Sequence, residues 1–112
     1  MNEITDEYMR DMLTKSRPYT AVLLRATEKR AEPGADAVIW EHGRRNFALR
    51  AEGRLAIVFP VTDDSPWAGI GIFAGTPEEV DRIMADDPGV RAGIFTYEVH
   101  PGRGFPGDAL PG

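Results

Sequence analysis

The chain has 112 residues, of which 42% are hydrophobic and 28% are charged, a composition typical of one ordinary globular domain. Its net charge of −5 argues against a nucleic-acid-binding or anionic-membrane-binding surface, and the absence of cysteine excludes thiol catalysis, disulfides and thiolate metal sites. No apolar run approaches the ~20 residues that span a bilayer, and the charged first residues do not form a signal peptide, so we expect a cytoplasmic protein.

The first predicted elements are a helix over 1–16 and a strand over 19–26. Ile4, Tyr8 and Met12 are spaced by four, which predicts an amphipathic helix that covers its own domain or a partner. The strand is apolar on both of its faces, and such strands are usually buried on both faces.

A second helix is predicted over 36–52, with Asp36 as its N-cap and Gly53 after its end. Its apolar pattern is irregular, so periodicity does not decide whether His42 points inward. A glycine within a helix costs about 1 kcal/mol relative to alanine. We therefore expect Gly43 either to permit close packing or to leave room beside His42.

Two further strands are predicted over 55–59 and 68–73. In the second of them Gly69 and Gly71 share one face. Small residues on one face leave space above a strand, either for a packed helix or for a ligand.

The strongest local signal is the capping box that begins at Thr76, which predicts a helix ending near Asp86. A last strand follows over 93–100. The segment 101–112 is rich in Pro and Gly, and we expect it to be an extended arm.

These elements predict an α+β fold of the ferredoxin-like βαββαβ type. Its two core helices cover one face of the sheet, so the other apolar face needs a cover, which a homodimer with stacked sheets would supply. The expected organisation is an N-terminal helix (1–17), a ferredoxin-like domain (18–100) and a C-terminal arm (101–112).

Asp87 continues the apolar stripe of the last predicted helix, seven residues after Val80 and four after Ile83. A buried carboxylate is costly unless it is paired, and a helix C-terminus disfavours negative charge. Both effects predict a raised pKa for Asp87, as is common for acid–base groups.

Three short motifs resemble the YCII-related (YciI-like) family. They are Glu41-His42, the stretch from Gly53-Arg54-Leu55 to Phe59-Pro60, and Asp86-Asp87-Pro88 followed by Val90 and Ala92-Gly93. The similarity covers roughly 19–100. The Asp-Pro-x-Val-x-Ala-Gly string is its most specific part.

The resemblance implies a dimeric α/β-barrel fold with a His–Asp pair, here His42 and Asp87, in a pocket between helices and sheet. Most members of the family have no assigned reaction, and one characterised relative eliminates chloride from a chlorinated hydroxyquinol. This chain departs from the usual family pattern at Gly43 and at Phe59-Pro60.

The sharper hypothesis is acid–base catalysis by a cofactor-independent lyase or isomerase. Asp87 would hold one nitrogen of His42, and the other nitrogen would move a proton of a small molecule. Arg45 and Arg91 are candidates for binding an anionic oxygen, and Tyr97 for stacking on a ring. In the plainer interpretation His42 is a partly exposed helix residue, Asp87 caps the Pro-Gly turn, and the arginines are solvated.

Two other classes of function stay open beside catalysis: a dimeric module that binds a small ligand without chemistry, and a plain assembly domain. No cofactor is expected, because no phosphate loop, nucleophile elbow or dinucleotide fingerprint is present. A metal site is not expected, because the two histidines are not spaced as a pair.

Overall fold

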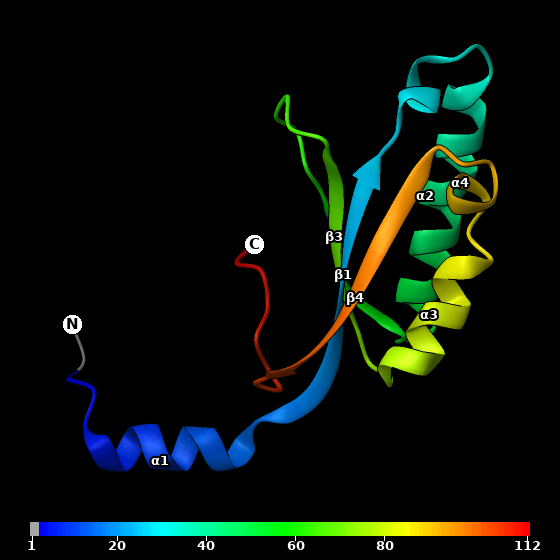
Figure 1. Ribbon diagram of the computed structural model, residues 1–112. Helices are drawn as coiled ribbons and strands as arrows, with labels where there is room; N and C mark the ends of the chain where they lie inside the picture. Colours follow the sequence, from blue (N-terminus) through cyan, green and yellow to red (C-terminus); the bar gives the residue numbers. More distant parts are fainter. Residues whose placement is uncertain (1–2) are drawn as a thin grey trace.

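The computed structural model describes residues 3–112 (Figure 1). Its helices and strands, in chain order, are α1 (Asp6–Lys15), β1 (Arg17–Ala26), the 3₁₀ helix η1 (Glu28–Ala31), α2 (Ala35–Ala51), β2 (Leu55–Pro60), β3 (Trp67–Phe73), α3 (Pro77–Ala85), α4 (Pro88–Arg91) and β4 (Phe95–Gly104). No helix within these residues is long and apolar enough to cross a membrane.

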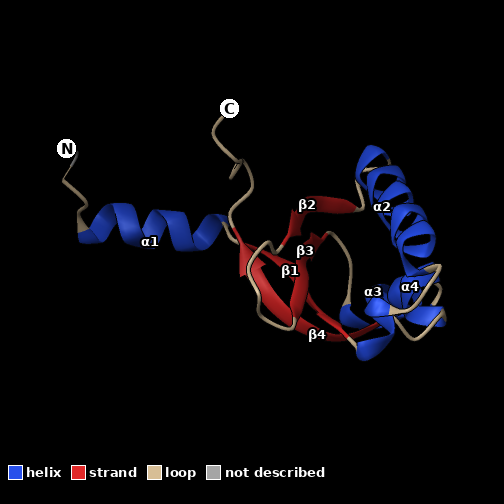
Figure 2. Ribbon diagram, turned by 90° about the horizontal axis from the view of Figure 1, so that it is seen from above, coloured by secondary structure: helices blue, strands red, loops and turns tan. Residues whose placement is uncertain are grey.

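The four strands form one antiparallel sheet in the order β2-β3-β1-β4. This order, with a helix after β1 and helices after β3, confirms the predicted ferredoxin-like α+β fold. Helices α2, α3 and α4 all lie on one side of the sheet, whereas α1 and the C-terminal segment lie on the other side (Figures 1 and 2).

The hydrophobic core lies between the sheet and the three helices. The sheet contributes alternate residues of its strands, such as Val22, Leu24 and Phe73, and α3 contributes Val80 and Met84. Each of these side chains is at most 6% exposed. The core therefore fixes α2 and α3 over the middle of the sheet.

The opposite side of the sheet, which we call the open face, carries two apolar rows across three strands. The residues of these rows are paired in register, Ile57 with Ile72 and Ala21, and Phe59 with Ile70 and Leu23. Neighbouring residues in register share a face of the sheet. The structure confirms that the strands are apolar on both faces, but the helices of one chain cover only one of them.

The helix boundaries follow local chemistry, with one correction. The Oγ1 of Thr76 accepts a hydrogen bond from the backbone N–H of Glu79, as the capping box predicts. The prediction that Asp36 caps α2 is wrong, because Gly34 occupies the N-cap position with φ of +87° and makes no side-chain cap. A glycine adopts this left-handed conformation without strain, and the N-cap of α2 lies two residues earlier than predicted.

The last strand is longer than predicted. β4 runs to Gly104, and its end pairs with the start of β1, where Pro101 lies opposite Thr20 and Gly104 opposite Arg17. The prediction that the arm begins at Pro101 is therefore wrong. β4 is an edge strand, and proline is tolerated at a sheet edge because half of the N–H groups there make no ladder bond.

Helix α1 projects away from the sheet (Figure 1) and buries none of its residues. Its last turn is joined to β4, because Arg103 donates from Nε to the Oγ of Ser16 at 2.8 Å and from Nη2 to its carbonyl oxygen at 3.1 Å. The helix was predicted to cover either its own domain or a partner. It does not cover its own domain.

Candidate functional site

The site is built on a short helix that the sequence did not predict. After α3 ends at Ala85, the chain does not simply turn at Pro88-Gly89 but forms α4, with Asp87 as its N-cap. The Oδ2 of Asp87 accepts hydrogen bonds from the backbone N–H groups of Gly89 at 2.9 Å and Val90 at 3.2 Å. Four residues are too few to show helical periodicity, which is why this element was missed.

The other oxygen of the same carboxylate reaches α2. The Oδ1 of Asp87 lies 2.8 Å from the Nδ1 of His42, and both side chains are almost entirely withdrawn from solvent, with 1% and 11% of their surfaces exposed. The two groups come from positions 45 residues apart in the chain. His42 is thus an inward-facing residue of α2. Asp87 also caps the turn, as the plainer interpretation predicted, so the cap and the pair with His42 exist together.

The pKa of Asp87 lies below its ordinary value, which contradicts the predicted direction. Burial is the largest single influence and raises the pKa, but the hydrogen bond and charge of His42 and the N–H groups of Val90 and Gly89 together outweigh it. The prediction failed because Asp87 was assigned to the C-terminus of one helix, whereas it stands at the N-terminus of the next. There the backbone presents donors rather than acceptors.

The ionised carboxylate determines the tautomer of the imidazole. A carboxylate only accepts hydrogen bonds, so the Nδ1 of His42 carries the proton that it shares with Asp87. The Nε2 atom lies 3.2 Å from the Nδ2 of Asn46. In the neutral ring Nε2 is an acceptor and Asn46 donates to it. Both nitrogens of His42 therefore have partners within the chain.

Asn46 was not singled out from the sequence. The signal was present, because a residue four positions after His42 lies on the same face of the helix. The ring of His42 is also held by Phe95, whose ring centroid is 4.9 Å away at an angle of 51°. These contacts fix the imidazole at both nitrogens and on its ring face.

Arg45, a predicted ligand-binding residue, lies beside the pair. Its Nη1 atom is 3.7 Å from the Oδ1 of Asp87 and is buried without a hydrogen-bond partner. Arg45 is not among the residues that line either of the two cavities described below. Arg45 is therefore not placed to contact a molecule bound in either cavity.

Arg91 and Tyr97, the other predicted ligand-binding residues, are not brought to the pair. Arg91 is exposed at the end of α4. The hydroxyl of Tyr97 donates to Oδ1 of Asp81 at 2.7 Å, and burial together with this carboxylate raises the pKa of Tyr97 to about 12. Tyr97 thus joins β4 to α3.

A pocket of about 170 Å³ lies between α2 and the sheet, and His42 and Asn46 form part of its wall. Gly69 and Gly71 line its floor. A Cβ added at Gly71 would lie 3.2 Å from Cδ1 of Leu55 and 3.3 Å from Cε2 of Phe73, so core side chains fill part of the space that was expected above this strand. A cavity of roughly 150 Å³ accommodates one benzene ring, so this pocket has room for a single six-membered ring. Asp87 is not exposed to the pocket and lies behind His42.

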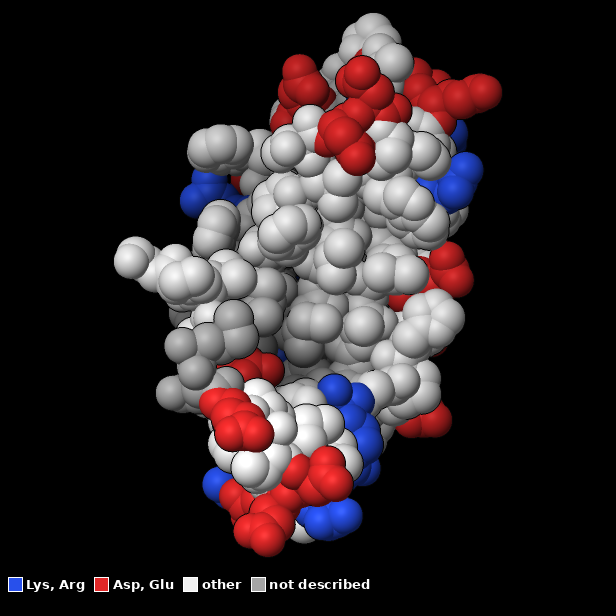
Figure 3. Space-filling model, turned by 90° about the vertical axis from the view of Figure 1, so that its left-hand side faces the viewer, with Lys and Arg blue, Asp and Glu red and all other residues white. Residues whose placement is uncertain are grey.

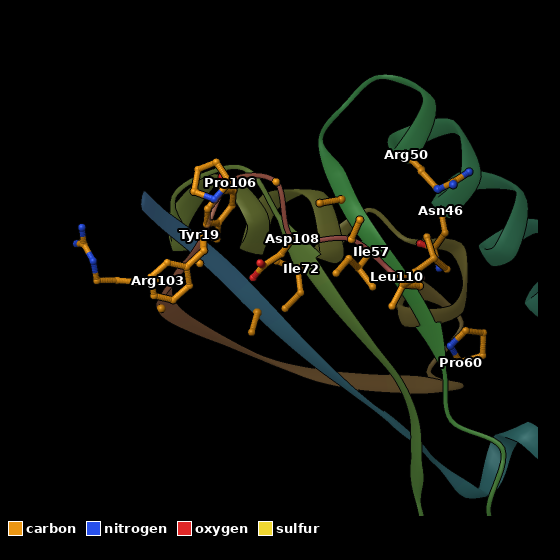
Figure 4. A pocket seen from close by; sticks show the side chains of 18 of the residues that line it. Tyr19, Asn46, Arg50, Ile57, Pro60, Ile72, Arg103, Pro106, Asp108 and Leu110 are labelled. Carbon is orange, nitrogen blue, oxygen red and sulfur yellow. The ribbon is translucent and has the colours of Figure 1, made fainter. Parts of the chain in front are cut away.

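A second, larger hollow of about 1000 Å³ extends around β2 and over the open face (Figure 4). The C-terminal segment crosses this face and lines the hollow with Pro106, Asp108 and Leu110, while Asn46 lines it from α2. Gly43 also lines this hollow, and nothing lies within 4 Å of a Cβ added there, so the prediction of close packing at Gly43 is wrong. The open space beside Gly43 belongs to this hollow and not to the pocket that His42 lines.

Within residues 3–112, no group of three or more His, Asp or Glu side chains is placed to hold a metal ion. His100, the second histidine, is exposed and lies 3.2 Å from the carboxylate of Glu98. The described residues thus concentrate their buried ionisable groups around Asp87.

The comparisons with known proteins find similarity among solved structures. No family model matches the chain, and no curated protein matches it. Among solved structures, 5-chloro-2-hydroxyhydroquinone dehydrochlorinase (TftG) from Burkholderia phenoliruptrix AC1100, in complex with 2,5-dihydroxybenzoquinone, is similar with 20% identity and a TM-score of 0.49. The likeness covers 73% of this chain and 90% of that one.

Proposed function

We propose that the chain is a YCII-related protein that binds a single-ring small molecule in the pocket between α2 and the sheet and transfers a proton on it. The reaction class is that of a lyase or isomerase without a cofactor. The observation that carries the proposal is the buried pair of His42 and Asp87, in which His42 forms part of the pocket wall. The family motifs around His42 and Asp87 support the same assignment.

His42 would be the acid–base group and Asp87 would act through it. With Nδ1–H bound to the carboxylate, Nε2 carries the lone pair that removes a proton from a carbon or hydroxyl of the ligand. The imidazolium that forms would be stabilised by Asp87, whose lowered pKa keeps it ionised at neutral pH. Protonation of the departing or rearranged group then returns His42 to its neutral form.

Asn46 would have to release Nε2 before this transfer. Its amide donates to the neutral imidazole, and after rotation by half a turn its oxygen accepts from the protonated one. Asn46 therefore has a hydrogen bond for either state of His42. Arg45, beside Asp87, would be a positioning residue for the carboxylate.

Proton transfer is testable with a simple ring ketone. In D₂O, we expect the protein to accelerate deuterium uptake at the carbon next to the carbonyl of cyclohex-2-enone, followed by proton NMR. His42→Ala should lower this rate by about 10²-fold or more. His100→Ala is the matched control, because it removes the exposed histidine, and it should leave the rate unchanged. Equal rates for His42→Ala and the parent protein would reject catalysis by His42.

A non-catalytic binding module is the second candidate, and one observation favours it. Both nitrogens of His42 are already engaged, by Asp87 and by Asn46, as in a structural hydrogen-bond network. This candidate predicts that phenol shifts the backbone amide resonance of Gly71 in the pocket floor, while deuterium uptake by the ketone stays at the rate of buffer.

The open face supports a homodimer as the working form of the protein. One chain leaves the two apolar rows of this face without a covering helix, and stable interfaces between copies bury about 800 Å² or more on each partner. Sedimentation equilibrium tests this part of the proposal, with a mass of two chains as the expected result.

A further inference from the structure

One copy of the chain exposes more surface than a compact monomer of its length. Its accessible surface is 8021 Å², whereas a compact chain of this size is expected to expose about 6,100 Å². Its radius of gyration is 16.4 Å, against about 13 Å for a compact domain. The excess of about 1,900 Å² falls within the share per copy of obligate homodimers.

The excess arises on the side of the sheet that has no core helices. There α1 projects from the start of β1 and the C-terminal segment crosses the open face (Figures 1 and 2). Figure 3 views the molecule from this side and shows a largely uncharged, hollowed centre with charged groups toward its two ends.

Helix α1 carries its own unused apolar side. A broad stripe faces solvent, with each large residue between 50% and 59% exposed; these residues are Tyr8, Met9 and Leu13, with Ile4 just before the N-cap. The remaining side of the helix is charged. A helix of ten residues is marginal in water without packing on such a stripe, so the stripe needs a contact that its own chain does not provide.

The direction in which helix α1 leaves the body is defined. The bonds from Arg103 to Ser16 hold its C-terminal turn against the end of β4, and Thr5 caps its N-terminus through the N–H of Tyr8. The helix therefore leaves the body at a fixed point and extends outward, past the side on which the open face lies (Figure 1).

We propose that α1 is an exchanged arm: in the homodimer each copy packs the apolar stripe of its α1 against the body of the other copy. The inference rests on the homodimer proposed above and adds the element that holds it together. Stacked sheets lie ≈ 10 Å apart, and a helix of ten residues is about 15 Å long. A helix of this length extends far enough from the open face to lie beside a second copy that packs there over the C-terminal segment (Figure 1).

A second copy fits this surface better than a different partner does. A two-fold interface brings the same patch from both copies together. The stripe and the open face are both apolar and lie on the same side of the chain. A two-fold dimer would therefore bury both surfaces of each copy. The excess surface matches the amount that such an interface removes.

The test compares three variants by sedimentation equilibrium. Tyr8→Glu places a charge on the stripe and should weaken the dimer at least ten-fold in dissociation constant. Arg10→Glu, on the charged side of α1, changes the charge more and should have no effect. Leu23→Glu, on the open face, should also dissociate the dimer. A dimer constant unchanged by Tyr8→Glu but raised by Leu23→Glu would overturn the exchanged arm and leave the homodimer standing.

A second measurement shows which copy the arm touches. The chain has no cysteine, so Met9→Cys carries a single spin label. In mixtures of labelled chains with ¹⁵N-labelled chains that lack the spin label, we expect broadened amide resonances in the body of the ¹⁵N chain. A second sample contains chains that carry both the spin label and ¹⁵N. Broadening in that sample but not in the mixture would overturn exchange. A monomeric parent protein would overturn both the arm and the homodimer, while deuterium uptake by the ketone would still report on His42.

Discussion

The two faces of the sheet are built from similar residues but differ in what covers them. Leu24 points to the helix side and is 6% exposed, whereas its neighbour Leu23 points to the open face and is only half-buried. On the helix side α2 and α3 complete a core around Val80, which is fully buried. Alternation along a strand thus shows which faces are apolar, but not whether the same chain buries them.

The faces also differ in their polar groups. On the helix side Asp87 is fully buried and each of its oxygens is satisfied, one by His42 and the other by two backbone N–H groups. On the open side the ionisable residues of β4, Glu98 and His100, are exposed. We infer that the helix side carries the chemistry and the open side the assembly, and the predictions below test this division.

The largest effect is expected from Asp87→Ala. The substitution leaves the Nδ1–H of His42 and two backbone N–H groups of α4 without their acceptor, and it removes the carboxylate beside the buried Nη1 of Arg45. A buried donor left without its acceptor costs about 1–3 kcal/mol, and three donors lose theirs, so we expect a loss of about 3 kcal/mol or more in the free energy of unfolding measured with urea. A loss below about 1 kcal/mol would show that Asp87 is no part of the structural network.

The pH dependence of stability supplies the control. The pKa of Asp87 is lowered in the folded protein, so its stabilisation is present above the unfolded-state pKa of about 3.9 and is lost as the pH falls through the folded value. Asp87→Asn keeps the shape but not the charge. Its unfolding free energy should fall less between neutral and acidic pH than that of the parent protein.

Much of the fold was predictable because local and global signals agreed. The capping box at Thr76 and the glycine after α2 marked helix ends, and the strand order followed from the sequence of elements. The contact between His42 and Asp87 was predicted from the family motifs. Periodicity alone left His42 undecided, because α2 has no clear apolar stripe.

The rest depended on tertiary context. Helix α4 is a single turn, and without it the charge environment of Asp87 was assigned the wrong sign. Pro101 reads as a strand breaker until its place in an edge strand is known. The position of α1 outside its own body is fixed by the bonds from Arg103 of β4 to Ser16, a contact between distant parts of the chain that no local pattern encodes.

The second prediction compares two adjacent leucines. Leu24→Ala removes part of the core and should cost about 2–5 kcal/mol of unfolding free energy at every protein concentration. Leu23→Ala should cost less than about 1 kcal/mol in dilute protein and more in concentrated protein, because the proposed dimer would bury Leu23 fully whereas one chain leaves it half-buried. Urea unfolding at two protein concentrations measures both.

Equal costs for the two leucines, independent of concentration, would contradict the division between the faces. That result would mean that one chain covers the open face by itself in solution. It would also remove the basis for an exchanged arm.

The third prediction compares two glycines near the site and has the smallest effect. A Cβ at Gly89 would lie 2.5 Å from Cδ2 of Phe95 and 3.1 Å from Oδ2 of Asp87, so Gly89→Ala must displace the ring that supports His42. We expect a loss of about 1–3 kcal/mol and a changed imidazole resonance of His42. Gly43→Ala meets nothing within 4 Å and should instead stabilise α2 by up to about 1 kcal/mol. If Gly89→Ala left both stability and the His42 resonance unchanged, Phe95 would be free to move and the imidazole would not be held on its ring face. The helix side would then be less rigid than its burial implies.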